Sequence, residues 1–206
     1  MKKSVFILSL TGVFLFASCK KENPTTTSQT STNKYNEINT NEVVLMGAQY
    51  NVEGSFYSTS DQKVYKLAEA TGSESIQAKI DFAYYYGMTY GATIGSTDNA
   101  DVKGALPKLN TWTKRNNTVF EIFDELKSTD FDKIKNDSIF KDSSFFVGDF
   151  TKANGLIIGQ MVKFKTVNGK RGVFKVKEIT SGKNSVTGNL NDPQFGQIKL
   201  IVKVEK

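Results

Sequence analysis

The chemistry open to this chain is limited by two residue types. Its 206 residues contain no histidine and a single cysteine, Cys19. The missing imidazole excludes Ser-His-Asp and Cys-His catalysis, histidine general bases and nearly all zinc and iron sites. The sequence contains no glycine-rich phosphate loop of the P-loop or Rossmann type. A carboxylate pair of the glycosidase type and a Ser-Lys dyad stay open. No motif supports either, so we expect a non-enzymatic protein without a metal or cofactor.

Aromatic side chains are the first candidates for ligand binding. Tyr84, Tyr85 and Tyr86 are consecutive in an alternating segment, so they lie on both faces of the expected strand and at least one should meet solvent. Trp112 lies in a long polar stretch. Sugars stack on such rings, and the polar edges of the rings supply hydrogen bonds. The alternative is that Tyr84 and Tyr86 pack in the core and that Trp112 anchors a loop.

A set of lysines is the second candidate. In three C-terminal segments lysine alternates with Val, Phe, Ile or Leu, so that the apolar residues face the core and the lysines face outward. If the three strands are neighbours, these lysines form one exposed surface that could bind an anionic envelope component. The alternative is a solvated face that keeps the sheet soluble. The lysines are Lys163, Lys165, Lys175, Lys177, Lys199 and Lys203.

The middle of the chain offers two further possibilities. Asp137-Ser138-Ile139 resembles the O-glycosylation motif of exported Bacteroidetes proteins, which implies a sugar on Ser138; the alternative is an ordinary loop serine. Acidic residues cluster between residues 124 and 142, but Asp130-Phe131-Asp132 lacks the glycine of a calcium loop. Lysines interspersed among these acids predict a solvated helical face with ion pairs.

Cys19 follows a segment with three parts. Two lysines, Lys2 and Lys3, precede an apolar run over residues 5–16 and then Ala17-Ser18. This order is typical of a secretory signal. The apolar run is shorter than the roughly 20 residues that span a membrane. The sequence therefore predicts export rather than a membrane span.

Leu15-Phe16-Ala17-Ser18-Cys19 resembles a bacterial lipobox. The resemblance implies a signal peptide over residues 1–18, cleavage before Cys19, and fatty acyl chains on Cys19 that hold the protein on a membrane. Residues 19–41, rich in Thr, Asn and Ser after the cysteine, are expected to form a lipidated, disordered tether. Lys20-Lys21-Glu22 resembles the surface-export signal of Bacteroidetes lipoproteins, which implies the outer membrane, at its periplasmic face or at the cell surface.

The remaining residues, 42–206, suit a single domain with its own core. Alternation predicts strands over residues 42–52, 54–59, 64–67, 76–86, 90–94, 162–166, 172–179 and 196–204. Asn168-Gly169 predicts a hairpin. We expect a loop over residues 95–115, a helix from Asn117 or Thr118 to Leu126 with Glu121 in a capping box, and a second helical turn from Ser128.

This order predicts an α+β fold of antiparallel β-sheet meanders with a small helical insert. Residues 56–82 and 164–200 are similar enough to suggest two related copies of one meander, although any two amphipathic hairpins look alike.

Four segments of the mature chain together resemble a group of Bacteroidetes envelope lipoproteins of unknown function. They are residues 79–86 (KIDFAYYY), 112–118 (WTKRNNT), 162–166 (VKFKT) and 169–176 (GKRGVFKV). The resemblance implies location and fold, and it transfers no catalytic residue.

These observations lead us to expect a lipid-anchored envelope protein with a non-enzymatic binding or interaction domain. The ligand would be a glycan or an anionic envelope component, and another envelope protein is a further possible partner. An anchored glycan hydrolase and a structural subunit of an envelope complex are the alternatives. Formal net charge falls from +6 to +4 when residues 1–18, with two lysines and no acid, are removed. That charge is too mild to indicate nucleic-acid binding.

Overall fold

The computed structural model describes residues 34–47, 54–145, 147–184, 187–189 and 191–206. The predicted signal peptide, Cys19 and most of the predicted tether lie outside these residues. The first strand, β1 (Ile38–Met46), begins four residues before the predicted domain boundary at residue 42. Among the described residues, no helix is long and apolar enough to cross a membrane.

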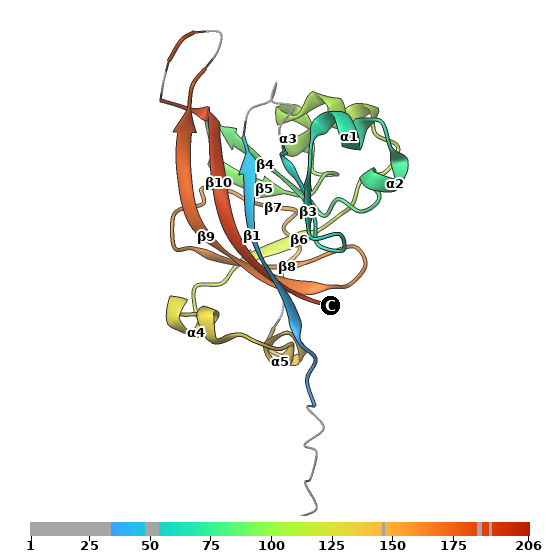
Figure 1. The fold of residues 1–206 in the computed structure, drawn as a ribbon, viewed down its shortest axis with the longest axis vertical. Coiled ribbons are helices and arrows are strands. Elements are labelled where there is room, and N and C mark those ends of the chain that lie inside the picture. The colour runs from blue at the N-terminus through green and yellow to red at the C-terminus, as the bar shows by residue number, and fades with distance from the viewer. Residues whose placement is uncertain (1–33, 48–53, 146, 185–186, 190) are drawn as a thin grey trace, which may run out of the picture. The chain divides into compact units, whose positions relative to one another are not determined.

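The first sheet has five antiparallel strands in the order β1-β10-β9-β8-β6 (Figure 1). Its other members are β6 (Val119–Ile122), β8 (Met161–Lys165), β9 (Arg171–Gly182) and β10 (Asp192–Glu205). The predicted Asn168-Gly169 hairpin joins β8 to β9 and is confirmed. Gly169 has a φ of +82°, which a residue without a side chain adopts at little cost.

The second sheet is also antiparallel, in the order β3-β2-β4-β5-β7. Its strands are β2 (Phe56–Ser58), β3 (Lys63–Tyr65), β4 (Phe82–Gly87), β5 (Gly91–Gly95) and β7 (Lys152–Ala153). Residues 76–86 were predicted as one strand, but β4 is shorter. Ser73 caps a preceding helical turn by accepting a hydrogen bond from the Ile76 amide, and that turn diverts the chain before β4 begins.

The main core lies between the two sheets. Its centre is a group of rings in which Phe82 lies 5.2 Å from Tyr57, 5.8 Å from Phe164 and 6.0 Å from Phe174 between centroids. The sheet edges are joined as well, since the Phe120 amide donates to the Phe150 carbonyl at 2.7 Å. Such aromatic pairs contribute about 1 kcal/mol each beyond the area that they bury. The sandwich is thus closed by packing inside and by hydrogen bonding at its edge.

Short helices cover the outer face of the second sheet (Figure 1). They are α1 (Leu67–Thr71), α2 (Glu74–Gln77), α3 (Ala100–Ala105) and the 3-10 helix η1 (Pro107–Thr111). They bury a second core that contains Phe56, Ile80, Tyr85, Val102 and Leu109.

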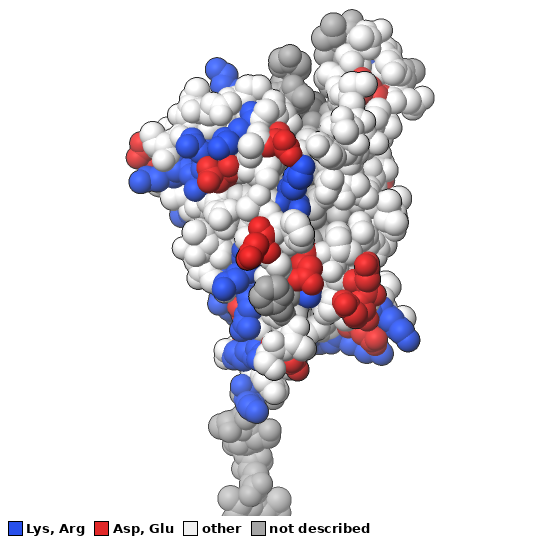
Figure 2. All heavy atoms as spheres, turned by 180° about the vertical axis from the view of Figure 1, so that it is seen from behind, with Lys and Arg blue, Asp and Glu red and all other residues white. Residues whose placement is uncertain are grey.

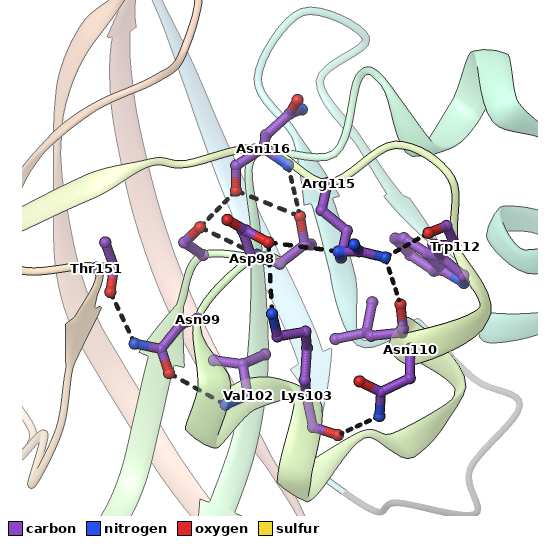
Figure 3. A network of polar contacts seen from close by, with 12 residues as sticks. Asp98, Asn99, Val102, Lys103, Asn110, Trp112, Arg115, Asn116 and Thr151 are labelled. Carbon is purple, nitrogen blue, oxygen red and sulfur yellow. Dashed lines mark hydrogen bonds and ion pairs between the residues drawn. The ribbon is translucent and has the colours of Figure 1, made fainter.

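The loop predicted over residues 95–115 is therefore wrong, because α3 and η1 lie there. Asn99 caps α3 by accepting hydrogen bonds from the amides of Asp101 and Val102, and its side chain donates to Thr151 Oγ1 at 2.7 Å (Figure 3). Each helix has five or six residues, too few for a helical period to be visible in the sequence.

A third core covers the outer face of the first sheet. It is built from the chain between β6 and β7, which includes α4 (Ser128–Lys133) and α5 (Ser138–Lys141). Phe131, Phe140 and Phe145 pack there against Met161 and Val173 of the sheet. The predicted helical turn from Ser128 is confirmed.

The helix predicted from residue 117 or 118 to Leu126 is wrong, because β6 occupies Val119–Ile122. Phe120 faces the main core and lies opposite Phe164 of β8. The apolar residues at helical spacing are thus divided between two cores. The Glu121 carboxylate does not complete a capping box: it accepts from the Gly148 amide at 2.8 Å and pairs with Lys163 at 3.2 Å.

The fold class is as predicted: α+β, mostly β, with antiparallel strands and a small helical insert. The two segments that suggested an internal repeat have different strand orders. In residues 56–82 the third strand, β4, pairs with the first strand, β2. In residues 164–200 the third strand, β10, pairs with the second strand, β9. The similarity of the two segments reflects their amphipathic alternation and not a shared topology.

Candidate functional site

The three consecutive tyrosines of β4 have different environments. Tyr84 lies in the main core and is fully buried, whereas Tyr85 lies in the second core and is 4% exposed. Neither is a platform for a ligand, because both faces of β4 are covered. Burial raises the pKa of Tyr84. Among the described residues, neither hydroxyl has a hydrogen-bond partner. Tyr86 is half-buried and is the one of the three that meets solvent, in agreement with the prediction that at least one would; it shares a face with Tyr84 but lies near the end of β4.

Trp112 is also unavailable to a ligand, since it is only 2% exposed. Its ring packs on Phe56 with centroids 5.0 Å apart, and its Nε1 donates to Thr71 Oγ1 at 3.1 Å. Arg115 donates to the backbone carbonyls of Leu109 and Trp112 (Figure 3). Trp112 therefore anchors its loop.

The lysine-bearing strands β8, β9 and β10 are neighbours, which was the condition for the predicted lysine surface, but the prediction of a single exposed surface is wrong. Lys163 and Lys203 are 6% and 4% exposed because the third core covers their face of the sheet. Lys163 lies over the Phe123 ring, 4.9 Å from its centroid. Burial is also the main reason that the pKa of Lys203 is lowered.

Three other lysines of the set are neutralised by nearby acids. Lys175 pairs with Asp132 at 2.7 Å, Lys177 with Glu42 at 2.5 Å and Lys199 with Glu178 at 3.1 Å. Lys165 is exposed on β8. Figure 2 shows positive and negative side chains interspersed over one side of the domain. A continuous anion-binding face is therefore absent from the described strands.

Ser138 is the first residue of α5 and is half-buried. The neighbouring Asp137 carboxylate is occupied, because it accepts from the Asn36 amide at 2.8 Å and pairs with Lys141 at 2.7 Å. The Lys141 hydrogen bond lowers the pKa of Asp137. This pair confirms that the acids and lysines of the middle segment form ion pairs, as does Asp130 with Lys133 at 3.0 Å.

Tyr86 lies at one end of the sandwich, where β4 turns into β5. On one side of it is a hollow of about 480 Å³. The hollow is lined by Tyr86, Met88, Asn189, Asp192, Pro193 and Gln194. The Asp192 carboxylate accepts hydrogen bonds from the backbone amide of Gln194 at 2.9 Å and from the side-chain amide of Asn184 at 2.8 Å. This polar hollow thus places a tyrosine ring beside two side-chain amides and a carboxylate.

Tyr86 also borders a second hollow, of about 460 Å³. The described residues that line it include no charged side chain; they are Tyr86, Gly91, Ala92, Gly155, Leu156, Ile157, Ile158 and Ile179. The loop that carries the two consecutive isoleucines is fixed to both sheets. The Leu156 amide donates to Ala92 of β5 at 3.0 Å, and the Gly159 amide donates to Val176 of β9 at 2.8 Å. This apolar hollow therefore has a supported wall.

A third hollow, of about 510 Å³, lies where β1 begins. It is lined by Asn36, Glu37, Asp137, Lys141, Asn168, Gly169, Lys170, Glu205 and Lys206. Most of its charges are paired within the protein, with Lys206 on Glu37 at 2.8 Å and Arg171 on Glu205 at 3.0 Å, whereas no ion pair holds Lys170 among the described residues. The Lys206 hydrogen bond lowers the pKa of Glu37. This hollow offers a ligand few unpaired charges.

Sequence reasoning identified Tyr86 but missed the residues around it. Met88, Ile157 and Ile158 are 90%, 65% and 63% exposed, which is unusual for large aliphatic side chains. A signal was present in the sequence, because two consecutive isoleucines lie in a loop between Gly155 and Gly159. Asn189, Asp192 and Gln194 carried no comparable signal, since polar residues are common near the end of a hairpin.

Comparison with known proteins identifies the fold only. No protein family model and no curated protein matches the sequence. A solved structure with a similar fold is a DUF4466 family protein from Parabacteroides merdae, with a TM-score of 0.56 and 14% sequence identity. The match covers 83% of this chain and 54% of that chain, so this chain spans about half the length of that protein.

Proposed function

We propose that this protein is a lipid-anchored envelope lipoprotein whose domain binds carbohydrate at Tyr86. The observation that carries the proposal is the half-buried Tyr86, which lines one hollow together with Asn189, Gln194 and Asp192. A sugar ring presents C–H groups on its faces and hydroxyl groups at its edge. An aromatic ring packs against the C–H faces of the sugar. Carboxylates accept hydrogen bonds from its hydroxyl groups, and side-chain amides both donate and accept them.

The distribution of charge supports a neutral ligand over an anionic one. Charged side chains are sparse around the end that carries the β9–β10 hairpin, at the upper right of Figure 2. Asp192, the one carboxylate among the described residues that line the polar hollow, would repel an anion. Most of the predicted lysine surface is buried or paired and lies on other parts of the domain.

The anchor is proposed from the lipobox-like sequence that ends at Cys19. The two ends of β1 then indicate which way the site faces. Ile38 pairs with Glu205, and Met46 pairs with Gln197 near the polar hollow. Nine residues of strand span about 30 Å. The binding site therefore lies at the end of the domain away from the point where the tether would enter, and a protein of the outer membrane would present it outward.

The alternative of a glycan hydrolase has less support. A glycosidase acid needs a raised pKa, but in the hollow at the start of β1 the pKa values of Glu37 and Asp137 are lowered by their lysine hydrogen bonds. A Ser-Lys dyad is not favoured either. Lys175 donates to Ser128 Oγ at 3.2 Å, but an ammonium that also pairs with Asp132 cannot accept the serine's proton.

The proposal is tested by glycan-array binding of the chain from residue 20 onward, which retains every element of the fold. Wild type should bind a subset of glycans, and Tyr86→Ala should lose at least tenfold in affinity for them. Phe150→Ala is the matched control, because it also removes an exposed ring, 72% exposed, which lines neither hollow at Tyr86. If no glycan binds, or if the two variants bind equally, carbohydrate binding at Tyr86 is wrong.

A further inference from the structure

The two hollows at Tyr86 differ in polarity and share that side chain. Besides Tyr86, the described residues that line the polar hollow are Asn189, Asp192 and Gln194 together with Met88 and Pro193, whereas those that line the apolar hollow are aliphatic residues and glycines. Their volumes, about 480 and 460 Å³, are both within the range of small-molecule sites. A ligand placed on Tyr86 would therefore adjoin both a polar and an apolar compartment.

The fold alone does not explain why aliphatic side chains are exposed at the apolar hollow. Ile157 and Ile158 leave most of their surface in water, although Leu156 beside them is buried. Exposed aliphatic side chains that border a hollow are typical of a surface that a ligand covers. A sugar alone would not use them, since its hydroxyl groups would lose hydrogen bonds to water without gaining partners there.

We infer that the ligand is an amphiphilic glycoside: a sugar headgroup held in the polar hollow and an alkyl or acyl group of the same molecule held in the apolar hollow, with Tyr86 between them. The inference rests on the proposed carbohydrate function and narrows its ligand class. It explains why aliphatic side chains are exposed beside a site whose polar groups suit a sugar. It also explains why the Ile157–Ile158 loop is held by backbone hydrogen bonds to both sheets, because a fixed wall loses less entropy on binding.

The test compares matched methyl and octyl pyranosides of glucose, galactose and mannose by calorimetric titration below the micelle concentration of the octyl compounds. The chain from residue 20 onward is used, so that no lipid on Cys19 can absorb the octyl chain. For the sugar that binds, the octyl glycoside should bind at least tenfold more tightly than the methyl glycoside. Tenfold is about 1.4 kcal/mol and corresponds to burial of about two methylene groups.

Variants of the apolar hollow test whether it causes the tighter binding of octyl glycosides. Ile157→Ser combined with Ile158→Ser should reduce the octyl advantage to about twofold and leave methyl-glycoside affinity unchanged. Val167→Ser is the control, since it removes an aliphatic side chain that is 54% exposed at the β8–β9 turn. Equal affinity for octyl and methyl glycosides in the wild type, or an octyl advantage that persists in the double variant, would overturn the inference.

A further probe separates failure of this inference from failure of the proposed function. Octyl tetraethylene glycol ether carries the same chain without a sugar, and it should bind at least tenfold more weakly than the octyl glycoside. If the ether binds as well as the glycoside, no sugar is recognised, and both the proposed carbohydrate function and the inference of an amphiphilic glycoside are wrong. If methyl glycosides bind and the octyl chain adds nothing, the proposed function stands and the inference fails.

Discussion

The ammonium of Lys203 lies 2.8 Å from the backbone carbonyl oxygen of Phe131, at the end of α4. It also donates to the carbonyls of Ile134 at 2.8 Å and Asp132 at 3.3 Å. The last carbonyls of a helix have no partners within the helix and carry partial negative charge, so a buried cation stabilises them. Lys203 thereby joins the helical insert to the first sheet.

Lys203→Met should lower the free energy of unfolding by about 3 kcal/mol, because the partly buried carbonyls of Asp132 and Ile134 lose this donor and the Phe131 carbonyl keeps only the Ile134 amide. Lys165→Met is the matched control: Lys165 also lies on a strand of the first sheet but is exposed, so its replacement should change stability by less than about 0.5 kcal/mol. Urea denaturation of both variants gives the comparison. Similar midpoints for the two variants would show that the Lys203 contacts contribute little.

The predictable and unpredictable parts of this molecule differ in physical origin. Strands β8 and β9 were predictable because alternation and the Asn168-Gly169 turn act locally. The burial of Lys163 and Lys203 was not, because it depends on a segment of the chain between β6 and β7 that folds back over the sheet. At the candidate site, the sequence offered Tyr84, Tyr85 and Tyr86 together and did not distinguish Tyr86, and the residues that surround it come from separate segments that only the fold brings together.

The buried carboxyl of Asp81 predicts a pH-dependent contribution to stability. Asp81 is 3% exposed and accepts hydrogen bonds from the amide and hydroxyl of Thr59, both at 2.7 Å. Burial raises its pKa above the ordinary 3.8. Between 3.8 and the raised value the folded state holds a proton that the unfolded state has lost. The contribution of Asp81 to stability therefore increases as pH falls through its raised pKa.

The free energy of unfolding of Asp81→Asn, measured relative to wild type, should therefore be higher at pH 7 than at pH 4. Asp137→Asn is expected to behave in the opposite sense: the Lys141 hydrogen bond lowers the pKa of Asp137, so the cost of losing the carboxylate is full at pH 7 and shrinks only as pH falls below the ordinary 3.8. Urea denaturation at pH 7 and pH 4 measures the difference for Asp81→Asn, and a further measurement at about pH 3 measures it for Asp137→Asn. A stability difference between Asp81→Asn and wild type that does not vary with pH contradicts this account of Asp81.

Gly91 follows the β4–β5 turn beside Tyr86 and has a φ of +64°. Gly91→Ala should destabilise the protein by about 1 kcal/mol, because this conformation strains a residue with a side chain. Gly104→Ala should instead stabilise by about 0.5 kcal/mol, since Gly104 lies in α3 with open space around it. Thermal unfolding distinguishes the two directions. Equal effects in the two variants would mean that the turn tolerates another conformation.

Cys19→Ser should abolish membrane anchoring, because the proposed acyl chains need the cysteine thiol. Fractionation of cells that express the variant should move the protein from the membrane pellet to the soluble fraction. The unaltered chain serves as the control. A variant that is processed normally and stays in the pellet after a salt wash would rule out lipid attachment at this residue.

The central claim is that carbohydrate binds at Tyr86, and amide NMR spectroscopy tests it most directly. The isotope-labelled chain from residue 20 onward is titrated with the methyl glycosides of glucose, galactose and mannose and with the glycans found on the array. Saturable shifts are expected at Tyr86, Met88, Asn189 and Gln194, and they should disappear in Tyr86→Ala. Absence of shifts with every sugar, or shifts confined to the hollow at Glu37 and Lys206, would contradict the account.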